Sequence, residues 1–334
     1  MIKLLTTAAV IAWRIASLPA IAAAQQTTPP PRFPVGNPVG LPIVQAPDGR
    51  FAPASANVKI YGSVYSAESC SYDPVRGLIV IPNRGVPQDV RANDAWITLM
   101  NHDGSIHTPR WIGVQGPGQR DSLTPALILN EPYGSQIANG VLYLADRDGG
   151  TGPNDPSISV IRRFDMRTGV PLSSMRVPGA GWFNDIAVAD DGTVYATVTP
   201  SNQLWRVPMQ GEATIVVTGE PLNRPNGVEI NKRGNIIVVN IGNAAVLTFS
   251  RDGTLVSTEQ AAQAGSDGIV IMDDGTKYVS SVVNGGVSRI RPGQPAELIA
   301  TNIPNAASMC YDAGARQLVI PMNANNAIAL IPLQ

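Results

Sequence analysis

Three segments of the sequence repeat one pattern: FNDIAV at 183–188, PNGVEI at 225–230 and SDGIVI at 266–271. Each segment contains a polar residue, here called the anchor (Asn184, Asn226 or Asp267), and a glycine follows eight positions after it. An alternating run precedes the glycine and a run rich in Val, Ile and Tyr follows it, which is typical of a β-hairpin. The anchors are 42 and 41 residues apart, and this period is typical of one four-stranded blade of a β-propeller.

The same pattern recurs in weaker form at three other places. Glu68 begins one unit at 68–81, a second lies at 133–144, and a third lies at 309–320. Together the units predict an all-β fold, a six-bladed β-propeller of four-stranded blades. The composition agrees, because 32 Gly, 29 Pro and only 15% charged residues are typical of a turn-rich β protein.

The last blade lacks one strand, because the chain ends soon after the run at 327–332. The segment NVKIYG at 57–62 has the length and alternation of a strand and precedes the first anchor. We therefore expect this N-terminal strand to complete the C-terminal blade and close the ring, which would remove an exposed sheet edge. The predicted propeller covers residues 57–334.

Residues 1–24 have the features of a signal peptide: Lys3, an apolar run to Trp13, and small residues at 22–24. An uncleaved membrane anchor is the alternative, but Arg14 interrupts the apolar run. Residues 25–56 are rich in Gln and Pro and are predicted to be a tether. We expect an exported protein, periplasmic or secreted, with no membrane span after the signal is removed.

The charge and the cysteines limit the partners and the chemistry. A net charge of −1 gives no field that attracts nucleic acid, so we expect a small-molecule partner. In an oxidising compartment Cys70 and Cys310 can form a disulfide. The preferred interpretation is two unpaired, buried apolar side chains, which is how such cysteines usually behave.

Glu68, Asn184, Asn226 and Asp267 occupy equivalent positions at the start of the first strand of a blade. Because first strands line the central channel of a propeller, the four anchors should converge there. Two carboxylates and two carboxamides offer oxygen ligands suited to one divalent ion: Ca²⁺, Mg²⁺, Mn²⁺ or Zn²⁺. Each anchor alone could simply cap a turn, but four at equivalent positions favour a metal site.

Other polar segments are expected to be structural. His102 and His107 lie away from the anchors, are predicted in surface loops, and leave a Ser-His-Asp hydrolase without a base. The segment DRDGG at 146–150 lacks the full ligand pattern of a calcium loop and is predicted to be a surface turn.

Glu68 and the starts Asn184-Asp185, Asn226-Gly227 and Asp267-Gly268 resemble the senescence-marker/gluconolactonase (regucalcin-like) family of six-bladed propellers, over residues 57–334. The resemblance implies that Glu68, Asn226 and Asp267 bind the metal. It also implies that Asn184 contacts substrate or bound water and that Asp267 is the catalytic proton-transfer residue. The implied activity is hydrolysis of a cyclic ester.

One position departs from the family. Sugar-lactone members commonly carry Arg two places before the Asn of the Asn-Asp start, where this chain has Trp182. An apolar ring there favours a more apolar lactone or ester, so Trp182 is predicted to bind substrate. The predicted function is a metal-dependent hydrolase of a lactone or ester that uses a metal-activated water. The alternative is a non-catalytic propeller that binds a ligand or protein and has a structural metal, because the fold hosts both classes.

Overall fold

The computed structural model describes residues 44–45, 51–52, 55–62, 64–84, 93–113, 125–149 and 157–333. The chain divides into two units after Pro30, and all described residues belong to the second unit, Pro31–Gln334. The predicted signal peptide lies outside the described residues, as does most of the predicted tether. Within the tether range, β1 (Val44–Gln45) pairs antiparallel with β2 (Phe51–Ala52). The limits of these N-terminal segments stay a prediction.

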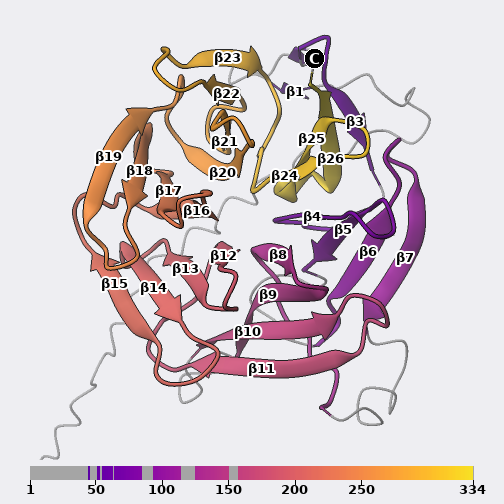
Figure 1. Ribbon diagram of the computed structural model, residues 1–334. Helices are drawn as coiled ribbons and strands as arrows, with labels where there is room; N and C mark the ends of the chain where they lie inside the picture. Colours follow the sequence, from indigo (N-terminus) through magenta and orange to yellow (C-terminus); the bar gives the residue numbers. More distant parts are fainter. Residues whose placement is uncertain are drawn as a thin grey trace, which may run out of the picture. The chain divides into compact units, whose positions relative to one another are not determined.

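The second unit is all-β, with six four-stranded antiparallel blades around a central channel (Figure 1), which confirms the predicted fold. Blade 1 contains β4 (Ser71–Asp73), β5 (Leu78–Asn83), β6 (Trp96–Met100) and β7 (Ile106–Gly113). Blade 2 contains β8 (Ser135–Ala138), β9 (Val141–Asp148), β10 (Ile158–Asp165) and β11 (Pro171–Val177). Blade 3 contains β12 (Ile186–Val188), β13 (Val194–Val198), β14 (Gln203–Val207) and β15 (Thr214–Thr218).

Blade 4 contains β16 (Pro225–Ile230), β17 (Ile236–Asn240), β18 (Ala245–Phe249) and β19 (Leu255–Gln260). Blade 5 contains β20 (Ser266–Ile271), β21 (Lys277–Ser281), β22 (Val287–Ile290) and β23 (Glu297–Ala300). Blade 6 contains β24 (Cys310–Asp312), β25 (Gln317–Met322), β26 (Ala327–Pro332) and, from the N-terminal side, β3 (Lys59–Tyr61). In every blade the first strand in this order is the innermost one.

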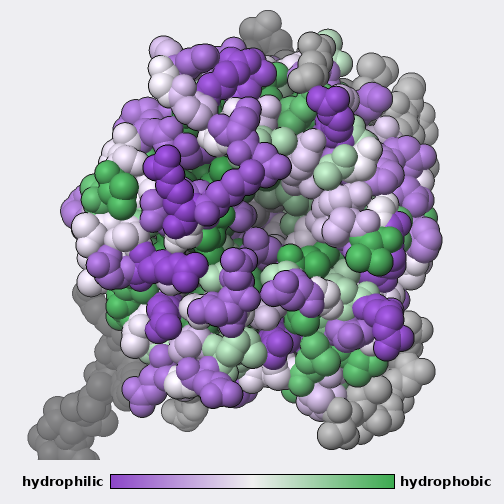
Figure 2. All heavy atoms as spheres, in the orientation of Figure 1, coloured by the Kyte–Doolittle hydropathy of each residue, from purple (hydrophilic) through white to green (hydrophobic). Residues whose placement is uncertain are grey.

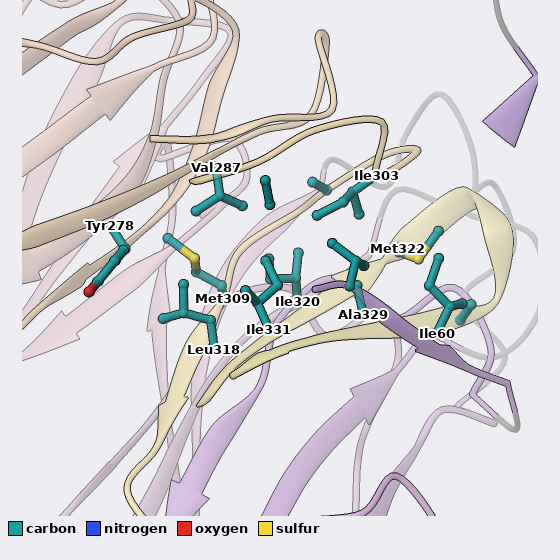
Figure 3. Packing of buried hydrophobic residues seen from close by; sticks show 14 of the residues in the cluster. Ile60, Tyr278, Val287, Ile303, Met309, Leu318, Ile320, Met322, Ala329 and Ile331 are labelled. Carbon is teal, nitrogen blue, oxygen red and sulfur yellow. The ribbon is translucent and has the colours of Figure 1, made fainter. Parts of the chain in front are cut away.

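The ring closes as predicted, through the N-terminal strand. β3 pairs antiparallel with β26, with Ile60 opposite Ala329. Figure 3 shows Ile60 beside Ala329 and Met322 in the apolar cluster that fills the space around blade 6. The strand therefore contributes backbone hydrogen bonds and a buried side chain, the latter stabilising the fold by about 2 kcal/mol.

The burial of a strand follows its position within a blade. The second strands are buried throughout in β5, β13, β17 and β25, because neighbouring blades cover both of their faces. Outer strands such as β19 are mostly exposed. The described residues also contain a 3-10 turn, η2 (Asn323–Asn325), between β25 and β26, and no α-helix. Within the same part of the chain, no helix has the length and apolar character needed to cross a bilayer.

The two cysteines form a disulfide, so the preferred sequence interpretation was wrong. Cys70 precedes β4 and Cys310 begins β24, and their Cα atoms are 5.5 Å apart. The innermost strands of the first and last blades are neighbours in the closed ring, which brings together two residues separated by 240 positions. Ring closure is therefore secured twice, by β3 and by this covalent bond.

Candidate functional site

The four anchors are buried at the start of the innermost strands. Asn226 and Asp267 are the second residues of β16 and β20. Asn184 lies two residues before β12, and Glu68 lies three residues before β4. Their exposed fractions are 5% for Glu68, 7% for Asn184, 1% for Asn226 and 2% for Asp267. Polar side chains this deeply buried need partners or a ligand.

The Asn-Gly and Asp-Gly pairs let neighbouring blades approach closely at this end of the channel. A Cβ atom at Gly227 would lie 2.2 Å from the carbonyl oxygen of Asp267, and one at Gly268 would lie 2.5 Å from the amide nitrogen of Met309. Only glycine fits such contacts. The Nδ2 atom of Asn226 then donates a hydrogen bond to Oδ2 of Asp267 at 3.2 Å. The repeated dipeptide thus has a packing cause, and it places two anchors in contact.

Three anchor oxygens are buried without a hydrogen-bond partner: Oδ1 of Asn184, Oδ1 of Asn226 and Oδ1 of Asp267. The nitrogen of each carboxamide is hydrogen-bonded, which orients the amide group. Nδ2 of Asn184 donates to Thr199 Oγ1 at 3.0 Å, and Nδ2 of Asn226 donates to Asp267. Leaving such acceptors unsatisfied costs about 1 to 3 kcal/mol each. Three of them in consecutive blades fit a bound cation or donor.

The donor set fits a hard ion better than a soft one. Among the residues that the structure describes, no group of three or more His, Cys, Asp or Glu side chains is arranged to hold a metal. An ion at the anchors would therefore rely on carboxamide oxygens beside carboxylates, which suits Ca²⁺ or Mg²⁺.

Glu68 already has two partners of its own. Its Oε2 atom lies 3.4 Å from Nη2 of Arg84 and accepts a hydrogen bond from Nδ2 of Asn323. Arg84 follows β5 in blade 1, whereas Asn323 begins η2 in blade 6. Neither Arg84 nor Asn323 was predicted from the sequence. They lie outside the repeated strand starts, so no periodic signal marks them.

Asp185, next to an anchor, is a further buried carboxyl group at the site. Burial raises its pKa to about 7, and the charge of Glu68 adds to this effect. It accepts hydrogen bonds from the Val228 amide at 3.2 Å and from Ser308 Oγ at 3.3 Å. Burial, and then the charges of Glu68 and Asp185, also raise the pKa of Asp267 well above its usual range, while Arg84 opposes them. The sequence analysis gave Asp185 no role, although it lies inside the repeated motif.

An aromatic wall adjoins the anchors. Trp182 stacks on Tyr133, with ring centroids 5.8 Å apart and planes 13° apart. Arg84 lies over the Tyr133 ring at 4.9 Å, and Arg147 lies over the Trp182 ring at 5.0 Å. Burial raises the pKa of Tyr133 to about 12, so its hydroxyl stays protonated and donates to Glu131 at 3.1 Å. The partner of Trp182 in this stack, Tyr133, was not predicted from the sequence. The predicted role of Trp182 in substrate binding stays a prediction.

Residues 146–148 lie in a strand and not in a surface turn, which corrects the sequence prediction for this part of the segment 146–150; Gly150 lies outside the described residues. Asp146 to Asp148 end β9, and Asp146 is completely buried. Its Oδ2 atom accepts a hydrogen bond from Nε of Arg162, on the adjacent strand β10, at 2.9 Å. The pairing gives the buried Asp146 carboxylate a partner of opposite charge.

The histidines lie away from the anchors, as predicted. His102 is in the turn between β6 and β7, and its Nδ1 atom lies 2.8 Å from Asp312 of blade 6. His107 is exposed on β7 itself rather than in a loop. Their positions leave the anchor site without an imidazole base from either of them.

A cavity of about 860 Å³ is lined by residues of several innermost strands, including Tyr72, Gln136, Glu229 and Ile271. The four anchors are not among its lining residues. A second cavity of about 520 Å³ shares Gln136 and Glu229 with it. Nε2 of Gln136 donates to Oε1 of Glu229 at 3.4 Å, which links blades 2 and 4 across blade 3. Figure 2 shows one face of the unit hollowed near its centre, where Figure 1 places the innermost strands.

The ring of blades and the buried polar group at its axis define the class of protein: a six-bladed β-propeller with a candidate ligand site at its innermost strand starts. Solved structures share this fold. A gluconolactonase from Xanthomonas campestris matches with a TM-score of 0.57 and 17% identity, over 90% of this chain and 99% of that chain.

A catalytically inactive histidine-to-alanine variant of virginiamycin B lyase from Staphylococcus aureus, with quinupristin, matches with a TM-score of 0.56 and 14% identity, over 83% of this chain and 100% of that chain. A streptogramin B lyase matches with a TM-score of 0.55 and 10% identity, over 83% and 98%. No family model matches the sequence, and no curated protein is similar enough to count as a relative. The resemblance to gluconolactonases is thus confirmed for the fold.

Proposed function

We propose that this protein is a hydrolase that opens a lactone or a related ester at the anchor site, with one divalent ion bound there. The observation that carries the proposal is the set of three buried, unpartnered oxygens on Asn184, Asn226 and Asp267. They come from the innermost strands of three consecutive blades or the residues just before them. A purely structural role for each side chain would have paired its oxygen.

Asn226 and Asp267 would hold the ion through their Oδ1 atoms, with Glu68 as a second carboxylate beside them. The ion would be Ca²⁺, Mg²⁺, Mn²⁺ or Zn²⁺, in the order in which oxygen-only ligands suit them. When bound, such an ion polarises an ester carbonyl and makes water more acidic.

Asp267 is the proton carrier in this proposal. One of its oxygens is held by Asn226, and the other is unpartnered. As water adds to the ester carbonyl carbon, Asp267 accepts the proton that the water loses, and it returns this proton to the alkoxide oxygen released when the ring C–O bond breaks. Asn184, whose amide group is held by Thr199, orients the substrate.

The aromatic wall suggests the kind of acyl group. Trp182 occupies the side of the site next to Asn184, and its stacking on Tyr133 gives it a fixed orientation. A flat apolar surface binds alkyl or aryl substituents better than sugar hydroxyls. An apolar lactone or aryl ester is therefore the substrate class we propose. Export to a periplasmic or extracellular compartment agrees with the disulfide, which persists under oxidising conditions.

Hydrolysis is favoured over the lyase chemistry named for two of the similar structures. One of those lyases loses activity when a histidine is replaced by alanine. In this chain the two histidines are His102 and His107, and both belong to the outer hairpin of blade 1, away from the anchors. We therefore assign proton transfer at the anchors to a carboxylate, that of Asp267.

The decisive experiment is a screen of purified, ion-loaded protein against a panel of lactones and aryl esters. Turnover should stop with a strong chelator and return with a divalent cation. Asp267→Ala should abolish it, whereas Asp252→Ala, in the exposed turn before β19, should have no effect. A folded, ion-loaded protein that turns over nothing above the Asp267→Ala background would instead support a non-catalytic, ligand-binding propeller.

A further inference from the structure

We infer that Arg84 is a built-in counter-ion of the anchor site, and that a divalent ion binds only in competition with the Arg84–Glu68 pair. The inference rests on the metal site of the proposed function. In this inference Arg84 is the internal cation that stabilises the ion-free protein. The affinity for metal then depends on how easily the ion displaces Arg84 from Glu68.

The pair is buried. Nη2 of Arg84 lies 3.4 Å from Oε2 of Glu68, and the exposed fractions of the two side chains are 5% and 6%. Water screens such a pair poorly, so each charge depends strongly on its partner. An arginine side chain cannot lose its charge in a protein, and the positive charge therefore stays at the site under all ordinary conditions.

Contacts of its own hold Arg84 in place. Its Nε atom donates to the carbonyl oxygen of Ser66 at 3.0 Å and lies 3.2 Å from Ser66 Oγ. Its guanidinium lies over the Tyr133 ring at 4.9 Å. The two contacts with Ser66 come from the segment before β4, and the contact with Tyr133 comes from the aromatic wall. The guanidinium is thus held beside Glu68 in the ion-free protein by contacts that do not depend on a ligand.

The charge of Arg84 lies beside one anchor carboxylate, that of Glu68, at 3.4 Å. In the ion-free site this carboxylate is therefore already paired with a fixed cation. A divalent ion that reaches Glu68 would be repelled by Arg84 and would have to replace its pairing. The same ion would face no such cost in a variant with a neutral residue at position 84.

Binding of the ion and the Arg84–Glu68 pairing must weaken each other by the same factor, because coupling between two binding events is reciprocal. Replacing Arg84 by methionine keeps an apolar stem against Tyr133 and removes the charge. Arg84→Met should bind Ca²⁺ or Mn²⁺ about tenfold more tightly than the parent, or better. With chelator present it should melt at a lower temperature, because Glu68 loses its positive partner, and added ion should raise its melting temperature more than that of the parent.

Titration calorimetry with CaCl₂ and MnCl₂, together with melting curves in chelator and in ion, tests these expectations. Arg110→Met is the matched control: Arg110 is exposed on β7, lies over the Trp96 ring at 4.3 Å, and loses the same charge. It should leave ion affinity unchanged. Arg84→Lys retains the charge and should keep the weak affinity of the parent.

The outcomes separate this inference from the proposed function. Equal ion affinity in parent and Arg84→Met overturns the inference and leaves the proposed metal site intact. Binding by Arg84→Met alone supports the inference and contradicts metal dependence of the parent. Absence of ion binding in both the parent and Arg84→Met overturns this inference and the proposed metal site. If Arg84→Met does not fold, Arg84→Gln is compared with Arg84→Lys, and equal affinities of these two variants overturn the inference.

Discussion

Glu229 should make the protein less stable as the pH rises, and Glu229→Gln should remove this effect. Glu229 lies in β16, half-buried between the two cavities, and receives hydrogen bonds from Gln136 Nε2 and from the Ile230 amide. Neither donor is charged. Burial is the main cause that raises the pKa of this carboxyl from 4.5 to about 7, with a smaller effect of Asp185.

The direction of this pH effect follows from the protons that the folded and unfolded states bind. Between pH 4.5 and about 7 the folded protein keeps a proton on Glu229 that the unfolded chain has released, so the free energy of unfolding falls as the pH rises. At about 1.4 kcal/mol per pH unit, the full cost above this range is at most about 3.5 kcal/mol. Glutamine keeps an acceptor oxygen for both donors and has no charge.

The assay is urea unfolding of ion-free parent and variant, followed by tryptophan fluorescence at about pH 4 and about pH 8. The two proteins should be nearly equal at the acid end, and Glu229→Gln should be more stable by about 1 to 3 kcal/mol at the alkaline end. Glu297→Gln is the control. A hydrogen bond from Arg289 lowers the pKa of the exposed Glu297, so the contribution of Glu297 to stability changes with pH in the opposite direction. Parallel stability curves for parent and Glu229→Gln across the whole range would refute the reasoning.

Three further predictions concern ring closure and substrate choice. Removal of the chain through residue 50 should leave the melting temperature unchanged, whereas removal through residue 65, which deletes β3, should lower it by about 5 to 10 °C; equal melting curves would contradict the role of β3. Replacing Cys70 and Cys310 by alanine should cost about 2 to 4 kcal/mol in denaturant unfolding, and a reducing agent should abolish the difference from the parent. Trp182→Arg should improve the turnover of polar sugar lactones relative to alkyl-substituted ones in competition assays, and an unchanged ratio would exclude Trp182 from the substrate site.

Much of the fold could be predicted because a propeller repeats one unit. The spacing of Asn184, Asn226 and Asp267 follows directly from the length of a blade, and the missing strand of the last blade made the role of residues 57–62 deducible. The anchors could be found for the same reason, since they occupy one position of the repeat. Their convergence is then a consequence of the ring.

The rest of the site depends on contacts between blades, which no local pattern records. Arg84 and Asn323 reach Glu68 from the ends of β5 and β25, in the first and last blades. Asp146 lies in a segment with the composition of a turn, and only the register of β9 against β10 gives it Arg162 as a partner. The disulfide was misjudged because the proximity of the first and last innermost strands exists only once the ring is closed.

The β3–β26 pairing also has a consequence for the folding order. Ile60 and Ala329 face each other although 269 positions separate them, which makes this one of the most distant contacts in the chain. Bringing such remote segments together costs about 5 kcal/mol of chain entropy, and this cost must be met before the contact stabilises anything. During synthesis the first five blades can form locally, but β3 waits without its partner strand until the sixth blade has left the ribosome. An interrupted or truncated product therefore exposes an unpaired strand edge, the kind of surface that chaperones and proteases recognise and that leads to aggregation.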